Sequence, residues 1–140
     1  MATRADSART DGQLGVTEFW AAQGHGSPMM IHSREDEGYL VLDGELTFWI
    51  NDDRPFVHGP GGFAWMPRGT PHAYAVSSPT ARFLCINTPG GLESFFGAVG
   101  APAEGDALPV AGSPTSDEIE RVEGAARGMG ITITGPPPGL

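Results

Sequence analysis

Two histidines and one glutamate carry the chemistry that this sequence most directly suggests. His32 falls in a short apolar run typical of a strand, Glu37 follows across a short polar turn, and His72 comes just after a turn containing proline and glycine. If these side chains converge, two imidazoles and a carboxylate can bind a divalent metal and leave positions open for substrate. Without a metal, the same groups can act as a general acid and base. We therefore treat these three as the candidate catalytic residues.

Side chains near this trio define the candidate pocket. Residues two apart on a strand point to the same face. The side chains two positions from the trio on their strands are therefore expected to line the pocket, namely Met30, Tyr39 and Tyr74. Phe48 and Trp65 are predicted to complete the wall, because large side chains must fill a barrel of this size.

Short strands separated by turns are the elements that must position these residues. The clearest runs are residues 14–20, 29–33, 39–42, 46–50, 56–58, 63–66, 72–76 and 81–87. Asp43-Gly44 is a strong hairpin signal, and it predicts that 39–42 pairs with 46–50. Strands this short, with a turn about every eight to twelve residues, predict an all-β sandwich or barrel.

The two ends of the chain differ from this central block. Residues 1–13 are small and polar, and they are predicted to form a flexible leader before a barrel over residues 14–97. Residues 98–140 are predicted to contain a Pro/Gly-rich linker, a short helix capped by Ser116, and a terminal strand that packs on the barrel. A further short helix is expected to begin near Gly91.

The amino-acid composition limits the classes of binding partner. The 8 Lys+Arg residues against 17 Asp+Glu give a net charge of −9, which argues against nucleic acid and anionic membrane surfaces. The single cysteine, Cys85, lies in an apolar run and is expected to be a buried strand residue rather than a nucleophile. No apolar stretch is long enough to span a bilayer, and the N-terminus lacks the apolar segment of a signal peptide, so we expect a cytoplasmic protein.

The spacing of these residues resembles the two sequence motifs of the cupin superfamily. The first motif is carried by Gly24, Met30-Ile31-His32, Glu37 and Gly44. The second is carried by Gly61, Pro67-Arg68-Gly69, His72 and Val76. The surrounding sequence is similar to small bacterial cupins called quercetin-dioxygenase-like. This resemblance implies a double-stranded β-helix, or jelly-roll barrel, with short C-terminal helices.

The resemblance also implies a metal site with a modified ligand set. His32, Glu37 and His72 match family ligands and would hold iron, nickel, manganese or zinc. Met30 stands where the family has its first histidine ligand, and a soft thioether there offers only a weak fourth position. His25, in the glycine-rich loop ahead of the motif, is expected to be a solvated loop residue rather than a replacement ligand.

Three functions are compatible with these observations. The first is a metal-dependent, dioxygenase-like enzyme acting on a small organic substrate. The second is a dehydratase, cyclase or isomerase of a natural-product pathway that needs no cofactor and uses His32 or His72 as general acid or base. The third is a non-catalytic cupin that only binds a small molecule. In that case the three buried side chains would only provide hydrogen-bond and charge partners for one another. An exposed sheet edge would also allow a homodimer.

Overall fold

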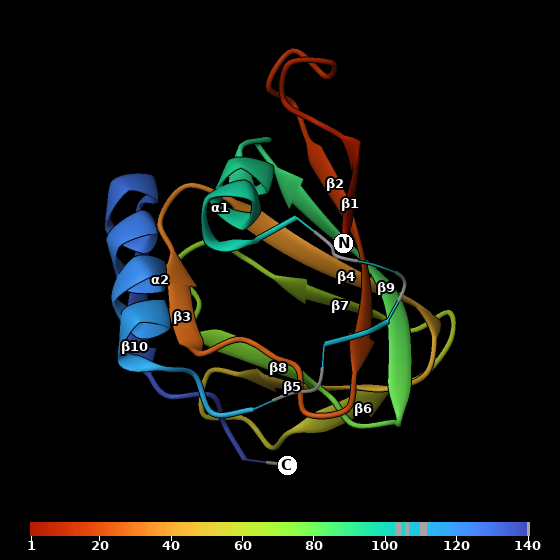
Figure 1. Ribbon diagram of the computed structural model, residues 1–140. Helices are drawn as coiled ribbons and strands as arrows, with labels where there is room; N and C mark the ends of the chain where they lie inside the picture. The colour runs from red at the N-terminus through yellow and green to blue at the C-terminus, as the bar shows by residue number, and fades with distance from the viewer. Residues whose placement is uncertain (103–104, 106, 110–111, 140) are drawn as a thin grey trace.

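Two five-stranded antiparallel sheets face each other in the structure, a computed structural model that describes residues 1–102, 105, 107–109 and 112–139 (Figure 1). The strands are β1 (Ala2–Ala5), β2 (Gly15–Ala22), β3 (Met29–His32), β4 (Asp36–Asp43), β5 (Leu46–Ile50), β6 (Phe56–His58), β7 (Phe63–Met66), β8 (His72–Val76), β9 (Thr80–Thr88) and β10 (Ile131–Gly135). The helices are α1 (Leu92–Val99) and α2 (Ser116–Met129). One sheet has the order β1-β2-β9-β4-β7 and the other β10-β3-β8-β5-β6.

Alternating side chains explain why these segments form the inner walls of a barrel. Along β9, Ala81, Phe83 and Cys85 are buried, while their neighbours Arg82 and Leu84 are exposed or half-buried. β9 pairs in continuous register with all of β2 and with most of β4, so the buried positions of three strands meet on one face. The predicted all-β fold with short C-terminal helices is confirmed.

The turn at Asp43-Gly44 does not make the hairpin that the sequence predicted. β4 pairs with β7 and β9, whereas β5 pairs with β6 and β8 in the opposite sheet. The chain therefore crosses between sheets at this turn. Gly44 has a φ of 75°, and a side chain there would collide with the backbone oxygen of Thr80. Glycine is thus required by a close backbone approach as well as by its conformation.

The N-terminal segment contributes a strand and a turn. β1 pairs antiparallel with β2 at the edge of the first sheet. The Ser7 backbone N–H donates to Glu93 Oε1 at 2.7 Å, which ties the following turn to α1. Part of the segment predicted as a leader, Ala2–Ala5, thus forms a strand at the edge of the first sheet.

The C-terminal elements cover one opening of the barrel. α1 and α2 lie side by side there, and β10 pairs with β3 in the second sheet (Figure 1). The cap of α2 is Thr115 rather than Ser116: its hydroxyl accepts the Glu118 N–H, and the Glu118 carboxylate accepts the Thr115 N–H in return. Within the described part of the chain, both helices fall short of the length and apolarity needed to cross a membrane.

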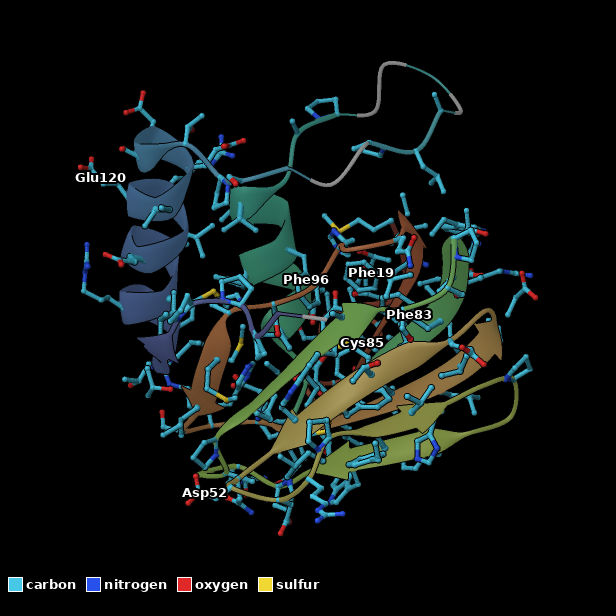
Figure 2. All side chains as sticks on the ribbon, turned by 90° about the horizontal axis from the view of Figure 1, so that it is seen from below. Phe19, Asp52, Phe83, Cys85, Phe96 and Glu120 are labelled. Carbon is cyan, nitrogen blue, oxygen red and sulfur yellow. The ribbon has the colours of Figure 1, made fainter. Side chains whose placement is uncertain are left out.

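Phe83 is the centre of an aromatic cluster between the sheets. Its ring stacks on Phe19 at 5.2 Å and contacts Tyr74 at 5.4 Å and Tyr39 at 5.8 Å, measured between ring centroids. Figure 2 shows Phe19 and Phe83 in the interior, with Phe96 of α1 close by. This cluster joins the core to the helical cover.

Replacement of Phe83 by alanine is expected to lower the free energy of unfolding by about 3–5 kcal/mol, because it removes a fully buried ring. Phe63→Ala is the matched control: its ring is 48% exposed on the outer face, and a loss below about 1 kcal/mol is expected. Chemical denaturation of both variants measures the difference. Equal losses would contradict the assignment of the inner and outer faces.

Candidate functional site

The structure brings His32, Glu37 and His72 together at the end of the barrel that the helices cover. His32 ends β3, Glu37 is near the start of β4, and His72 begins β8. All three are buried, and their ligand atoms lie within 4.8 Å of one another. Glu37 Oε2 is 3.0 Å from His72 Nε2 and 4.0 Å from His32 Nε2. The trio can therefore act as one chemical unit.

Glu37 is held by groups from three strands. Its Oε1 accepts hydrogen bonds from the Tyr39 hydroxyl at 3.2 Å and the Cys85 thiol at 3.1 Å. Tyr39 and Cys85 are register partners on β4 and β9, which places both donors on the inner face. Burial would raise the pKa of Glu37, but the His72 hydrogen bond and the charges of His32 and His72 outweigh it and lower the pKa to about 2. The carboxylate stays ionised, with Oε2 turned to the histidines.

His72 has a defined ring orientation. Its Nδ1 lies 2.8 Å from the Thr70 carbonyl oxygen, so Nδ1–H donates to the backbone. This leaves Nε2 to face Glu37. Burial would lower the pKa of His72, but the hydrogen bond and charge of Glu37 raise it overall. The ring can therefore hold a proton between itself and Glu37, or offer the Nε2 lone pair to a metal.

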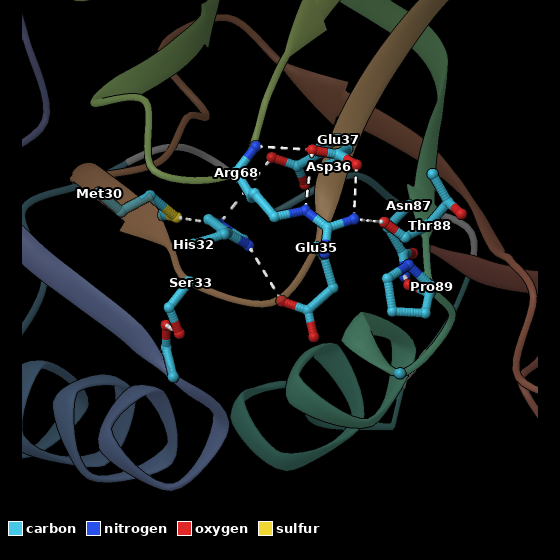
Figure 3. Close-up of polar contacts among 12 residues, drawn as sticks. Met30, His32, Ser33, Glu35, Asp36, Glu37, Arg68, Asn87, Thr88 and Pro89 are labelled. Carbon is cyan, nitrogen blue, oxygen red and sulfur yellow. Dashed lines mark hydrogen bonds and ion pairs between the residues drawn. The ribbon is translucent and has the colours of Figure 1, made fainter.

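His32 is the less satisfied of the two histidines. Its Nε2 lies 3.0 Å from the Met30 sulfur. Its Nδ1 has no hydrogen-bond partner among the described residues, and it faces Glu35 Oε2 at 3.8 Å (Figure 3). Burial lowers the pKa of His32, and the Glu37 charge opposes this only in part. Sequence reasoning missed Glu35, although its position three residues after His32 was a signal.

A cavity of about 330 Å³ opens beside the trio, between the barrel and its helical cover. Its walls are mostly apolar, and the residues that line it come from β2, β3, β4, β8, β10, both helices and the loop over 25–28. Among the described residues that line it, none is a lysine or arginine. Polar atoms are concentrated at His25, Ser27 and the trio side of the cavity.

Three of the predicted pocket residues line this cavity, namely Met30, Tyr39 and Tyr74. His25 also lines it and is exposed, yet it is not a free loop side chain: its Nε2 lies 3.3 Å from the Tyr74 hydroxyl. It is not among the residues whose potential ligand atoms lie within 4.8 Å of one another.

Phe48 and Trp65 lie elsewhere. Phe48 is fully buried but deeper in the barrel, where it stacks on Phe56 at 5.5 Å. Trp65 is 44% exposed and stacks on Phe63 on the outer face. The alternation of β7 explains this, because it is Ala64 and Met66 that point inward. The prediction that Phe48 and Trp65 line the pocket is corrected.

The helical wall of the cavity was not predicted. Its apolar side chains are Leu92, Phe95, Phe96 and Val99 of α1 and Val122 of α2. Leu92 and Phe95 are buried, and the Phe96 ring meets Phe19 edge-on at 5.1 Å between centroids. The apolar composition of α1 indicates that one of its faces packs against the protein. The sequence does not indicate which surface that face covers.

The fold and this site together define a cupin, and the sequence agrees. Residues 18–87 match the Cupin domain family, which is half of the chain. The chain therefore belongs to the cupin superfamily.

Individual relatives are more distant. The chain is 30% identical over 105 residues to quercetin 2,3-dioxygenase of Bacillus subtilis, covering 75% of the chain but only 31% of that protein. A Klebsiella pneumoniae protein with a double-stranded β-helix domain matches with a TM-score of 0.55 and 18% identity, over 64% of this chain and 76% of that one. The DMSP lyase DddQ of Ruegeria pomeroyi matches with a TM-score of 0.51 and 28% identity, over 59% and 41% of the two chains.

One ion pair joins the segment that carries Glu37 to the turn that leads into His72. Asp36, next to Glu37, accepts from the Arg68 side chain at 2.7 Å and from its backbone N–H at 2.8 Å. Arg68 lies in the turn that leads into His72. Its side-chain and backbone hydrogen bonds lower the pKa of Asp36 to about 2.

The Asp36–Arg68 pair is expected to persist in mild acid. A carboxyl whose folded pKa is depressed stabilises the fold above its ordinary pKa, and it loses that contribution as the pH falls through the folded value. The pair should therefore weaken only as the pH falls from about 4 to about 2. NMR titration of Asp36 measures this. Arg68→Met should return its pKa toward 3.8, whereas Arg34→Met should leave it unchanged; an ordinary pKa in the unmodified protein would mean that no pair forms.

Proposed function

We propose that this chain is a metal-dependent, dioxygenase-like cupin enzyme that acts on a small organic molecule. The observation that carries the proposal is the buried trio of His32, Glu37 and His72 beside a largely apolar cavity. Ionisable groups gathered at a cavity usually serve function, since burying them without a task is costly. Similarity to a bacterial quercetin dioxygenase over three quarters of the chain supports the oxygenase class.

The donor set fits a first-row transition metal. Two imidazole nitrogens and a carboxylate suit iron, nickel, manganese or zinc. Neighbouring ligands of one such ion lie about 3.0–3.4 Å apart. Glu37 Oε2 and His72 Nε2 are 3.0 Å apart, whereas His32 Nε2 is 4.0 Å from Glu37 Oε2 and would have to move closer when the ion binds. His32 would complete the set through Nε2, with the Met30 sulfur as a weak fourth ligand. When bound, the metal would supply open positions at which substrate and oxygen meet.

The cavity supports a small, uncharged and largely apolar substrate. Its volume of about 330 Å³ lies at the small end of ligand pockets. No lysine or arginine lies among the described lining residues, which favours an uncharged molecule over a strongly anionic one. Tyr74 and His25 offer hydrogen bonds to a hydroxyl or carbonyl group. The apolar helical wall would exclude water from the reacting end.

A second candidate function is metal-independent acid–base catalysis, as in a dehydratase, cyclase or isomerase. Two observations favour it: Met30 replaces a family ligand, and His72 already pairs with Glu37 at 3.0 Å. In that case His32, which lines the cavity, or His72, which Glu37 would hold in place, would exchange a proton with the substrate.

The first experiment is elemental analysis of tag-free protein. About one equivalent of a transition metal per chain, lost in His72→Ala, is expected because that variant removes one of the three strong ligands. His58→Ala is the control, since His58 packs against Phe48 and Phe56 instead of joining the trio. Absence of metal after loading with iron, nickel, manganese and zinc would overturn the metal proposal. Turnover that survives chelation but is lost in His72→Ala would establish the acid–base alternative; binding without turnover would make the protein a non-catalytic cupin.

Met30→His is expected to tighten metal binding by at least about tenfold, because it replaces a soft thioether with the imidazole that such metals prefer. Met30→Leu is the matched control, since it removes the sulfur without adding a ligand. Competition with a metal-binding dye measures the affinities of both variants and the unmodified protein. Equal affinity in the histidine and leucine variants would mean that position 30 does not face the metal.

A further inference from the structure

Two buried polar atoms face each other without a partner beside the trio. They are His32 Nδ1 and Glu35 Oε2, 3.8 Å apart, and neither has a hydrogen bond to any described residue (Figure 3). Glu35 is only 6% exposed. A buried carboxylate oxygen or ring nitrogen without a hydrogen bond lowers the stability of the folded protein. The orientation of these two atoms toward each other therefore needs an explanation.

The neighbours of Glu35 have other tasks. Asp36 turns outward to Arg68, and Glu37 turns inward to His72. Glu35 comes from the turn between β3 and β4 and points instead under the His32 ring, on the side away from Glu37 (Figure 3). Arg34 and Arg68 act on Glu35 only from a distance, since among the described residues no arginine makes an ion pair with it.

His72 indicates what this arrangement does. The Nδ1 of His72 donates to a backbone oxygen of Thr70, which leaves its Nε2 facing Glu37. His32 has no backbone oxygen as a hydrogen-bond partner for its Nδ1 in the described structure, and the oxygen it faces belongs to Glu35. Histidines that bind metals commonly donate their second nitrogen to an oxygen in this way, which fixes the tautomer and makes the ligand nitrogen more basic.

We propose that Glu35 is a positioning residue: its carboxylate accepts the Nδ1–H of His32 and so keeps the Nε2 lone pair facing Glu37 and His72. This inference rests on the proposed metal site. A shift of about 1 Å turns the present 3.8 Å separation into a hydrogen bond. A carboxylate polarises the imidazole more than a carbonyl does. Glu35 therefore makes His32 Nε2 more basic and a stronger metal ligand, next to the weak ligand Met30.

The test has one readout without metal and one with it. In metal-free protein, ¹⁵N NMR of the imidazole nitrogens, assigned with His25→Gln, His58→Gln and His72→Gln, reports the tautomer of His32. Nδ1–H is expected in the unmodified protein and in Glu35→Gln, whose amide oxygen still accepts, with loss of this preference in Glu35→Leu. Metal affinity should fall about 10–100-fold in Glu35→Leu and less in Glu35→Gln.

Glu93→Gln is the matched control for a purely structural role. Glu93 anchors the start of α1 by accepting the Ser7 and Gly91 N–H groups and does not contact His32. It should change neither the His32 tautomer nor the metal affinity.

An Nε2–H tautomer in the unmodified protein would overturn the inference, since Glu35 would then donate a proton to Nδ1 rather than accept one. An unchanged tautomer in Glu35→Leu would also overturn it, and so would an equal loss of affinity in Glu93→Gln. If Glu35→Leu does not fold, Glu35→Gln with the unmodified protein still gives the tautomer. Failure of the unmodified protein to bind metal would reject the proposed function alone, because the tautomer decides the role of Glu35 separately.

Discussion

The structure of the site depends on the hydrogen bonds that hold the buried carboxylate of Glu37. A charge in the interior of a barrel is tolerated only if surrounding groups replace its hydration. Tyr39 and Cys85 do this at one oxygen and His72 at the other. Because β4 and β9 belong to one sheet and β8 to the other, the same carboxylate links both walls of the barrel. Fold stability and the candidate chemistry therefore draw on one set of contacts.

The helical cover determines the environment in which this charge would act. A barrel open at one end would expose the trio to water, where electrostatic interactions are weak. The apolar side chains of α1 and α2 instead form one wall of a cavity beside the trio, and the Phe96–Phe19 contact packs α1 against the barrel. Figure 1 shows both helices over that end of the sheets. In such an enclosure, fixed dipoles and charges act more strongly on a bound molecule than they would in solvent.

The two histidines of the trio differ in the groups that surround their ring nitrogens. His72 has a backbone acceptor on one side and Glu37 on the other, so its burial is fully compensated. His32 has a sulfur on one side and an unpaired carboxylate oxygen on the other. This asymmetry follows from Met30, which places a weakly interacting thioether beside His32 where a histidine would stand in the family pattern.

The sequence by itself determined the class of fold and the identity of the trio. The short alternating strands carry the barrel pattern, and the two motifs, from Gly24 to Gly44 and from Gly61 to Val76, carry His32, Glu37 and His72 at fixed spacing. These features are local, because strand periodicity and turn residues act over a few positions. Met30 was also visible as a departure from the pattern.

Only the tertiary structure decided how these pieces meet. Asp43-Gly44 has the chemistry of a hairpin, but the chain changes sheets there because β4 finds its partners in β7 and β9, which come later in the sequence. Trp65 is an aromatic next to buried residues, and its face depends on the register of β7 against β4. The direction of Glu35 and the cover formed by α1 and α2 depend on contacts between segments far apart in the chain. Spacing along the sequence does not encode such contacts, since they arise from packing of whole elements against one another.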